Sequence, residues 1–219
     1  MARDADAAGD DRSRQKRVGE ALRDGTRRRI LAAAGEEFAA QGYRAATVAK
    51  LAAAAGVSVQ TLYLTWGSKR ALLRAWTETA IAGDAGVPAD AAARFGGGLA
   101  AGERIDLIAD IVTEVAARAA SAWAVYRDAA GVDPEIAEDW NDLQHRRHGL
   151  FTRLVGTLTE SDLAVGLSSA AAVDTAWTIA SPETYDLLVR RRGYSLDEFR
   201  EWLSRTLRAA LLPPDPMER

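Results

Sequence analysis

Residues 42–73, GYRAATVAKLAAAAGVSVQTLYLTWGSKRALL, contain two short helical patterns joined by a very short turn. Thr47 is a suitable N-cap for a helix that Gly56 ends, and a single residue separates this glycine from the next N-cap, Ser58. Such a pair is typical of a helix-turn-helix, whose second helix enters the DNA major groove while the first crosses the phosphate backbone. Short helix pairs linked by glycine also occur as plain packing units, so the pattern alone leaves both interpretations open.

The second helix of this pair, predicted at about 59–65, has two different faces. At about 100° per residue, Leu62 and Trp66 turn inward, whereas Gln60 and Leu64 lie nearly opposite. The flanking positions carry hydroxyl groups: Thr61, Tyr63 and Thr65. An amide and hydroxyls can bond base edges and phosphates, and the helix N-terminus adds free backbone amides for a phosphate.

Further helices are expected on both sides of the pair. Before it, Thr26 is a plausible N-cap for a helix over about 27–41, with Gly42 as its left-handed stop. After it, Ser68 caps a fourth helix. Residues 1–23 are polar and charge-mixed, which predicts a disordered arm, and we expect a DNA-binding domain over residues 24–84.

The remainder, residues 85–219, is expected to form a second, larger helical domain. Six glycines and Pro88 in residues 83–102 predict a loop, with a short helix near 89–94. One long or two abutting helices follow at 103–129, and Asp133 opens another that extends to about 156. The remaining helices are predicted at about 162–180, at 182–192 and from Ser195, whose capping box is completed by Glu198.

Composition supports an all-α fold. The chain of 219 residues contains 46 alanines against 13 valines and 7 isoleucines, which favours helix over strand. It contains no cysteine, which excludes disulfides and thiolate metal sites. No apolar run approaches the roughly 18 residues of a membrane span, so we expect a cytoplasmic protein without a membrane partner.

Charge is distributed unevenly along the chain. Residues 1–75 hold 14 Lys and Arg against 8 Asp and Glu, whereas residues 76–219 hold 14 against 23. This asymmetry is consistent with a small basic domain that binds a polyanion and is attached to a larger acidic body. An accidental bias on a solvated face would give the same numbers.

The segment from Thr26 to about Leu73 resembles the DNA-binding domain of TetR-family transcriptional regulators. The similarity is carried by Gly42-Tyr43, Thr47, AGVS at 55–58, TLY at 61–63, the aromatic Trp66 and the pair Ser68-Lys69. The resemblance implies an all-helical homodimer that binds a palindromic operator in double-stranded DNA. It also implies three N-terminal DNA-binding helices and a C-terminal domain that binds a small-molecule effector.

The same resemblance assigns roles to individual residues. Thr47, Tyr63 and Lys69 would contact phosphates, and the helix that Ser58 caps would present its side chains to base edges. Those at or near the bases would be Val59, Gln60, Thr61, Leu64 and Thr65. Leu64 stands where many relatives carry a polar or aromatic residue, which weakens any prediction of the operator sequence.

In the C-terminal body, two sets of apolar residues are candidates for function. Large aromatic residues in the middle helices could line an effector pocket: Trp123, Tyr126, Trp140, Trp177 and Tyr185. The final helix carries an apolar stripe that family analogy assigns to the dimer interface: Phe199, Trp202, Leu203, Leu207 and Leu211. The alternative is that the aromatics fill a core and that the final helix packs only within its own chain.

Signals for other functions are weaker. His145 and His148, with Asp142 one turn earlier, could present metal ligands on one helix face, but the intervening arginines would oppose a cation. No spacing singles out a catalytic group, so we predict neither an enzyme nor a cofactor or metal site.

The function predicted is a ligand-responsive DNA-binding regulator, in particular a repressor released by an apolar or amphipathic effector. The alternative is a helical small-molecule carrier or enzyme that uses the aromatic body.

Overall fold

The structure is a computed structural model that describes residues 2–83, 95 and 98–214, with side chains from residue 20 onward. Every regular element in these residues is helical, as an all-α fold requires. The chain divides into two compact units, residues 1–76 and 77–219. This division falls inside α4 (Lys69–Ala82), whereas the glycine-rich segment predicts it between residues 84 and 85. The short helix expected near 89–94 lies outside the described residues.

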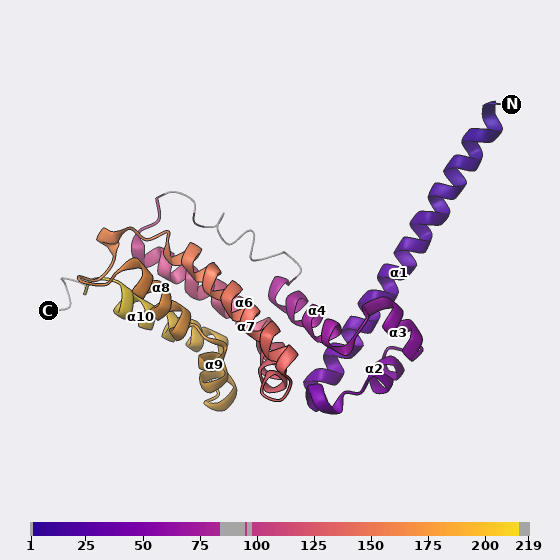
Figure 1. Cartoon of the computed structure of the whole chain (residues 1–219). Helices are drawn as coiled ribbons and strands as arrows, with labels where there is room; N and C mark the ends of the chain where they lie inside the picture. The colour runs from indigo at the N-terminus through magenta and orange to yellow at the C-terminus, as the bar shows by residue number, and fades with distance from the viewer. Residues whose placement is uncertain (1, 84–94, 96–97, 215–219) are drawn as a thin grey trace. The chain divides into compact units, whose positions relative to one another are not determined.

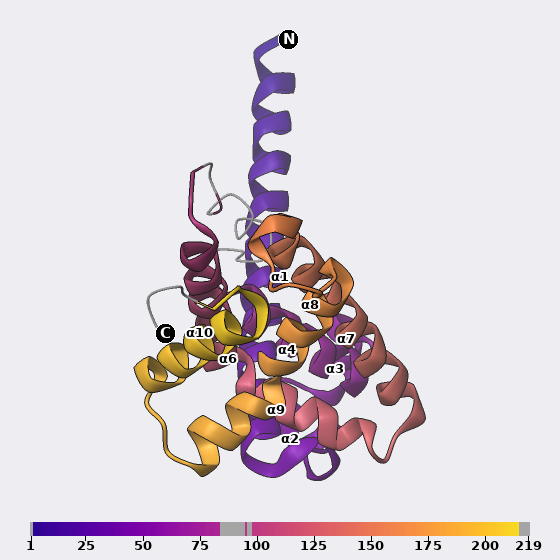
Figure 2. The same cartoon turned by 90° about the vertical axis from the view of Figure 1, so that its left-hand side faces the viewer.

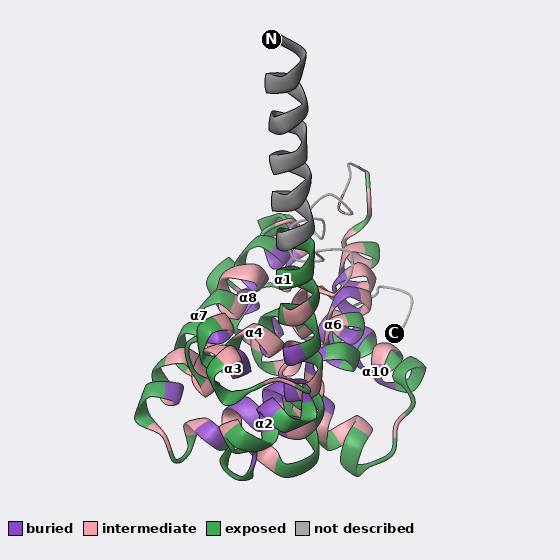
Figure 3. Cartoon of the chain, turned by 90° about the vertical axis from the view of Figure 1, so that its right-hand side faces the viewer, coloured by how far each residue is buried: buried purple, intermediate pink, exposed green. Residues whose placement is uncertain are grey.

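The first unit contains α1 (Ala2–Ala45), α2 (Val48–Ala54), α3 (Val59–Trp66) and the start of α4. In Figure 1, α2 and α3 lie beside the C-terminal part of α1, on which both pack. The core between these helices consists of fully buried apolar side chains, among them Ile30, Phe38, Leu51, Leu62 and Leu72. Figure 3 shows buried positions, in purple, on α1, α2 and α3.

α1 differs from its prediction. We expected a disordered arm over residues 1–23 and a helix starting after Thr26, but α1 begins at Ala2 and Thr26 lies inside it. The physical reason is that residues 2–25 are rich in Ala, Arg and other good helix formers and contain no proline, so nothing stops the helix from extending backward. The predicted stop is confirmed, because Gly42 leaves helical geometry with φ 76°.

The N-caps predicted for the next helices are confirmed. Thr47 Oγ1 accepts a bond from the Lys50 amide at 3.4 Å, Ser58 Oγ from the Thr61 amide at 3.0 Å, and Ser68 Oγ from the Ala71 amide at 3.0 Å. Each bond satisfies one of the amides that the first helical turn leaves unpaired. The turn between α2 and α3 is therefore fixed by local hydrogen bonds.

The second unit is a bundle of α6 (Ala101–Ala130), α7 (Pro134–Val155), α8 (Ser169–Ile179) and α10 (Leu196–Leu211). Shorter helical turns, η2 (Glu160–Asp162), α9 (Pro182–Tyr185) and η3 (Asp186–Arg191), connect them. α6 packs against α7 and α10, and α8 packs against α7 and α10 (Figures 1 and 2). α6 is one long helix, which settles the choice left open between one helix and two.

Two helices of this unit differ from prediction. α8 begins at Ser169, after the cap Ser168, instead of near residue 162, because Gly166 adopts φ 83° in the preceding segment. The helix expected at 182–192 starts at Pro182 as predicted but widens to π geometry from Asp186. The start of α7 at Asp133 and the capping box of Ser195 and Glu198 are confirmed.

An ionic network joins α6 to α10. Arg208 donates from Nε to Asp106 Oδ1 at 3.1 Å, and Arg208 Nη2 and Ser204 Oγ also donate to this carboxylate. One turn along, Arg200 pairs with Asp110. Partial burial raises the pKa of Asp106, but the hydrogen bonds from Arg208 and Ser204 and the charges of Arg208 and Arg200 together hold it below its ordinary value of 3.8.

The lowered pKa of Asp106 predicts a contribution to acid stability. A carboxylate with a lowered pKa in the folded protein stabilises it above the unfolded pKa, near 3.8, and this contribution is lost as pH falls through the folded value. Asp106→Asn should therefore lower the free energy of unfolding by about 1 kcal/mol at pH 7 and by progressively less below pH 4. Urea unfolding followed across pH tests this.

The same substitution at Asp128, whose side chain is 76% exposed, is the matched control and should change stability by less than about 0.5 kcal/mol. An equal loss for Asp106→Asn at pH 7 and at acid pH would contradict the ionic account.

Candidate functional site

The recognition candidate α3 has one anchored face and one exposed face. Leu62 is fully buried and Trp66 is nearly so, and both anchor the helix in the core. On the other side, Leu64 is 81% exposed and Tyr63 is 48% exposed. Val59 and Gln60 are also exposed. The Gln60 amide, the Tyr63 phenol and the two aliphatic side chains of this face therefore all reach solvent. The structure thus confirms the two faces predicted for this helix.

The threonines of α3 are engaged within their own helix. Thr61 Oγ1 lies 2.8 Å from Ser58 Oγ, and Thr65 Oγ1 donates to the Thr61 carbonyl at 2.7 Å. Both side chains are half-buried. A hydroxyl can still accept a bond while it donates one, but these two are less available for base contacts than Gln60.

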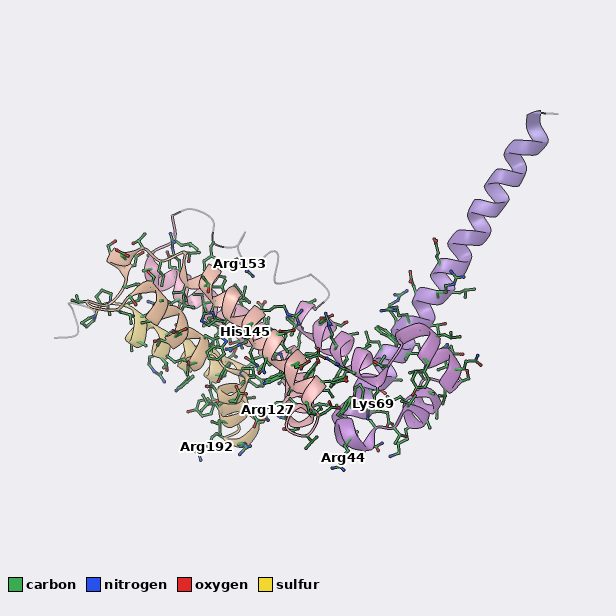
Figure 4. The ribbon with its side chains drawn as sticks, viewed as in Figure 1. Arg44, Lys69, Arg127, His145, Arg153 and Arg192 are labelled. Atoms are coloured by element: carbon green, nitrogen blue, oxygen red, sulfur yellow. The ribbon has the colours of Figure 1, made fainter. Side chains whose placement is uncertain are left out.

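Lys69, the predicted phosphate contact at the start of α4, also has a structural role. Its Nζ donates to the Tyr43 carbonyl at 2.9 Å and lies 4.0 Å from the centre of the Tyr43 ring. It thus ties α4 to the segment after Gly42, and it is half-buried. Figure 4 labels Lys69 together with Arg44, which is exposed in this segment. Thr47 is exposed at the start of α2, as a phosphate contact requires.

The structure brings two arginines of α1 to the recognition helix that sequence reasoning missed. The Arg27 guanidinium lies 3.7 Å from the centre of the Trp66 ring, and its Nη1 donates to the Thr65 carbonyl at 3.0 Å. Arg23 and Arg27 line a groove between α1 and α3 with Thr61 and Leu64. The charge excess of residues 1–75 indicated basic groups of this kind, but not which of them meet α3.

A second candidate site is a cavity inside the second unit, with a volume of about 460 Å³. This volume lies in the range of roughly 300–1,000 Å³ that is usual for small-molecule sites. Its wall is mainly apolar and comes from α6, α7, the end of α4 and the turn after α8. Residues on it include Ile81, Val112, Trp123, Leu150, Phe151 and Phe199, with Arg147 among the few polar ones.

Of the five aromatic residues predicted to bind the effector, Trp123 lines this cavity and the other four do not. Tyr126 is buried, stacks on Trp140 at 6.0 Å between ring centres and donates to Asp139 at 3.2 Å. Tyr185 packs edge-on against Phe199 at 5.1 Å. Trp177 packs beside His148 at 5.9 Å. For these four, contact with an effector remains a prediction, because helix spacing places aromatics inside the bundle without saying whether a space remains beside them.

The apolar stripe of α10 is also corrected. Four of its predicted interface residues have no exposed surface within the single chain: Phe199, Leu203, Leu207 and Leu211. They face α6 and α8 in the core and cannot contact a partner. Trp202 is half-buried and stacks on Phe199 at 6.4 Å. An amphipathic stripe shows that a helix needs a partner, and here the partner is the chain itself.

The two histidines do not form a metal site. His148 Nε2 lies 2.8 Å from Asp174 Oδ1, and His145 is exposed on α7 (Figure 4). Within the described residues, no three His, Asp or Glu side chains come together as possible metal ligands. Of the basic run at 190–192, Arg190 and Arg191 pair with Asp186 at 3.4 and 3.2 Å.

Within the described part of the chain, no single helix is long and apolar enough to cross a membrane. α2 and α3 reach the required length and hydropathy only when taken together, and a bend of 97° separates them.

Comparison with known proteins gives a family match in the first unit. Residues 30–76, from the buried part of α1 into α4, match the family model of bacterial regulatory proteins of the tetR family. No curated protein matches the chain. The match therefore covers the helix-turn-helix and the two helices that pack on it.

Solved structures show the same fold over most of the chain. NalD of Pseudomonas aeruginosa, the secondary repressor of the MexAB-OprM multidrug efflux pump, superposes with a TM-score of 0.67 at 18% identity, over 87% of this chain and 98% of its own. The fatty acid degradation regulator FadR of Bacillus halodurans superposes with a TM-score of 0.65 at 19% identity, over 83% of this chain and 94% of its own.

A candidate transcriptional regulator of Saccharomonospora viridis, solved in complex with choline, gives a TM-score of 0.64 at 18% identity, over 86% of this chain and 98% of its own. Identities this low show the fold and nothing finer. The family match identifies residues 30–76 as a DNA-binding region of the tetR family, and the solved structures show that most of the chain shares the fold of such regulators.

Proposed function

We propose that the protein binds a palindromic operator in duplex DNA as a homodimer and represses transcription until a small molecule enters the cavity of the second unit. This activity places the protein in the cytoplasm, with the DNA. The observation that carries the proposal is the outer face of α3, where Gln60, Tyr63 and Leu64 are exposed while Leu62 and Trp66 hold the helix in place. Val59, Tyr63 and Leu64 are all exposed on this one short helix, and a cluster of exposed apolar residues is typical of an interaction surface.

Each exposed group of α3 suits one kind of DNA contact. The Gln60 amide can bond an adenine edge in two places, and Leu64 can contact a thymine methyl group. Thr47 and Tyr63 suit phosphate oxygens, as do the backbone amides at the N-terminus that Ser58 caps. Lys69 carries a positive charge at the start of α4, and we assign it to a phosphate. Val59, Thr61 and Thr65 would lie near the bases.

A homodimer follows from the small size of this reading surface. A single helix pair makes too few contacts for strong specific binding, and two copies on a palindrome double them. Because the apolar stripe of α10 is buried, we assign the interface to the outer faces of α8 and α10. These faces present exposed residues four apart: Ala170, Asp174 and Thr178 on α8, and Glu201, Arg205 and Ala209 on α10.

The effector site is assigned to the cavity between α6 and α7. A ligand there can change DNA affinity only through different affinities for two conformations of the protein. Occupation would favour a conformation that spaces the two recognition helices wrongly for successive major grooves. The repressor role is supported by NalD, which has the same fold and is described as a repressor.

Phosphate and base contacts are separated by their dependence on salt. For wild type, the logarithm of affinity for duplex DNA should fall linearly with the logarithm of salt concentration, and Lys69→Ala should flatten this slope by about one unit. Gln60→Ala should instead weaken the preference for operator over random DNA with less change in slope. Fluorescence anisotropy over a range of salt concentrations measures both.

Arg192→Ala, which removes an exposed cation from the second unit, is the matched control and should leave the slope unchanged. Because Lys69 also bonds Tyr43, thermal unfolding of Lys69→Ala must show that the first unit remains folded at the assay temperature. Equal affinity of wild type for its own upstream DNA and for random duplex at low salt would contradict the proposal.

A further inference from the structure

Arg147, on α7, brings a buried positive charge to the apolar cavity. Its Nη2 donates to the carbonyls of Trp177 at 2.6 Å and Ala180 at 2.8 Å, the last turn and C-cap of α8. Its guanidinium lies 5.0 Å from the ring centre of Phe151, which lines the cavity, and 5.2 Å from that of Trp177. Arg147 itself lines the cavity and is largely buried.

No carboxylate pairs directly with this charge within the described residues. Both hydrogen-bond acceptors of Arg147 are neutral carbonyls, and no described acidic side chain lies within ion-pair distance of it. Glu183 interacts with Arg147 only by longer-range electrostatic attraction, because its carboxylate pairs with Arg127 at 3.7 Å. Burial lowers the pKa of Arg147 to about 10, and Glu183 offsets this only in part. The group therefore remains protonated at neutral pH, which is costly in an apolar environment unless an anion is present.

Hydrogen-bond donors are also in excess at this place. Both bonds of Arg147 use Nη2, so Nε and Nη1 have no acceptor among the described residues. These two nitrogens are accessible, and Arg147 lines the cavity, so they can donate to a ligand held there.

We propose that the cavity binds an apolar monocarboxylate, with the carboxylate on Arg147 and the hydrocarbon portion against the apolar wall. The inference rests on the proposed function, which makes this cavity the effector site. A planar carboxylate accepts two parallel bonds from a guanidinium, and either fork, Nε with Nη2 or Nη1 with Nη2, would recruit Nη2 from its two carbonyls. The apolar part of the wall, including Val112, Leu150 and Phe151, suits an alkyl or aromatic body. The other polar residues of the wall are Glu78, Gln144, Arg146, Arg153 and Ser181.

The position of Arg147 also gives a route from ligand to dimer. The arginine that would bind the carboxylate is the one that caps the C-terminus of α8. A carboxylate that draws the guanidinium toward the cavity weakens these two bonds and frees the end of α8. Since α8 carries part of the proposed dimer interface, occupation of the cavity is coupled to the geometry of the dimer.

The test compares three ligands of equal chain length on the wild-type protein without DNA. Isothermal titration calorimetry with octanoate, 1-octanol and octyltrimethylammonium should show octanoate binding at least tenfold more tightly than the other two. Arg147→Met should weaken octanoate binding by tenfold or more and leave octanol unchanged or tighter, while Arg147→Lys should restore part of the loss. The matched control is Arg192→Met, which removes an exposed arginine of the second unit that does not line the cavity. It should change octanoate binding by less than twofold.

Equal binding of octanoate and octanol to wild type, or no binding of octanoate, would overturn the inference even if the Arg147 variants fail to fold. DNA affinity is measured separately, with and without octanoate, so that a failure of the proposed DNA binding can be told apart from a failure of the proposed carboxylate site. DNA binding without octanoate binding overturns the carboxylate site alone. Octanoate binding that leaves DNA affinity unchanged supports the site but overturns its role as the effector site.

Discussion

Leu64→Glu should lower affinity for operator DNA by about 100-fold or more while the free energy of unfolding changes by less than about 0.5 kcal/mol. Leu64 is 81% exposed, so its replacement costs little in the free protein. In the complex, the new carboxylate would lie at the centre of the face that meets the DNA, where phosphates repel it and it loses hydration. Gel-shift titration with operator DNA, together with urea unfolding, tests both parts.

Val165→Glu is the matched control, because Val165 is fully exposed in the second unit and receives the same charge. Its affinity for DNA should remain within twofold of wild type. If Leu64→Glu binds within threefold of wild type as well, α3 does not face DNA and the assignment of the reading surface fails.

Phe199→Ala should destabilise the folded chain by about 3–5 kcal/mol. Phe199 has no exposed surface and contacts Tyr185, Trp202 and the wall of the cavity. Removal of the ring leaves a hole that connects to existing empty space, so the cost includes lost contacts as well as lost burial. The free energy of unfolding from urea titration is the measurement.

Protein concentration separates a core role from an interface role for Phe199. A core residue lowers stability by the same amount at every concentration, whereas an interface residue shifts the dissociation of the dimer. Arg205→Ala, on the exposed face of α10, is the control and should leave the stability of the protomer within about 0.5 kcal/mol. A Phe199→Ala protein that unfolds like wild type but dissociates more readily would restore the interface interpretation.

The sequence predicts those features of this fold that short-range chemistry determines. Thr47, Ser58 and Asp133 cap their helices because a hydroxyl or carboxylate reaches amides two or three residues away, whatever the rest of the chain does. The faces of α3 follow from helical periodicity alone. The helix-turn-helix is therefore predictable almost residue by residue.

Other features depend on packing between distant segments, and the sequence does not determine them. The stripe of Phe199 and Leu203 indicates a buried face but not whether the covering surface belongs to the same chain. The large aromatics gave no indication of where the cavity lies. Arg147 is indistinguishable from Arg146 in the sequence, yet one caps α8 beside the cavity and the other is exposed. Only the fold separates them.

Selection of bound sites from a pool of random duplexes tests the central claim most directly. With the full-length protein at moderate salt, the account predicts enrichment of a palindrome whose half-sites face the same side of the duplex, about one helical turn or a multiple apart. The Leu64→Glu protein should enrich no site from the same pool. A wild-type protein that enriches no sequence, or only an asymmetric single half-site, would contradict the account.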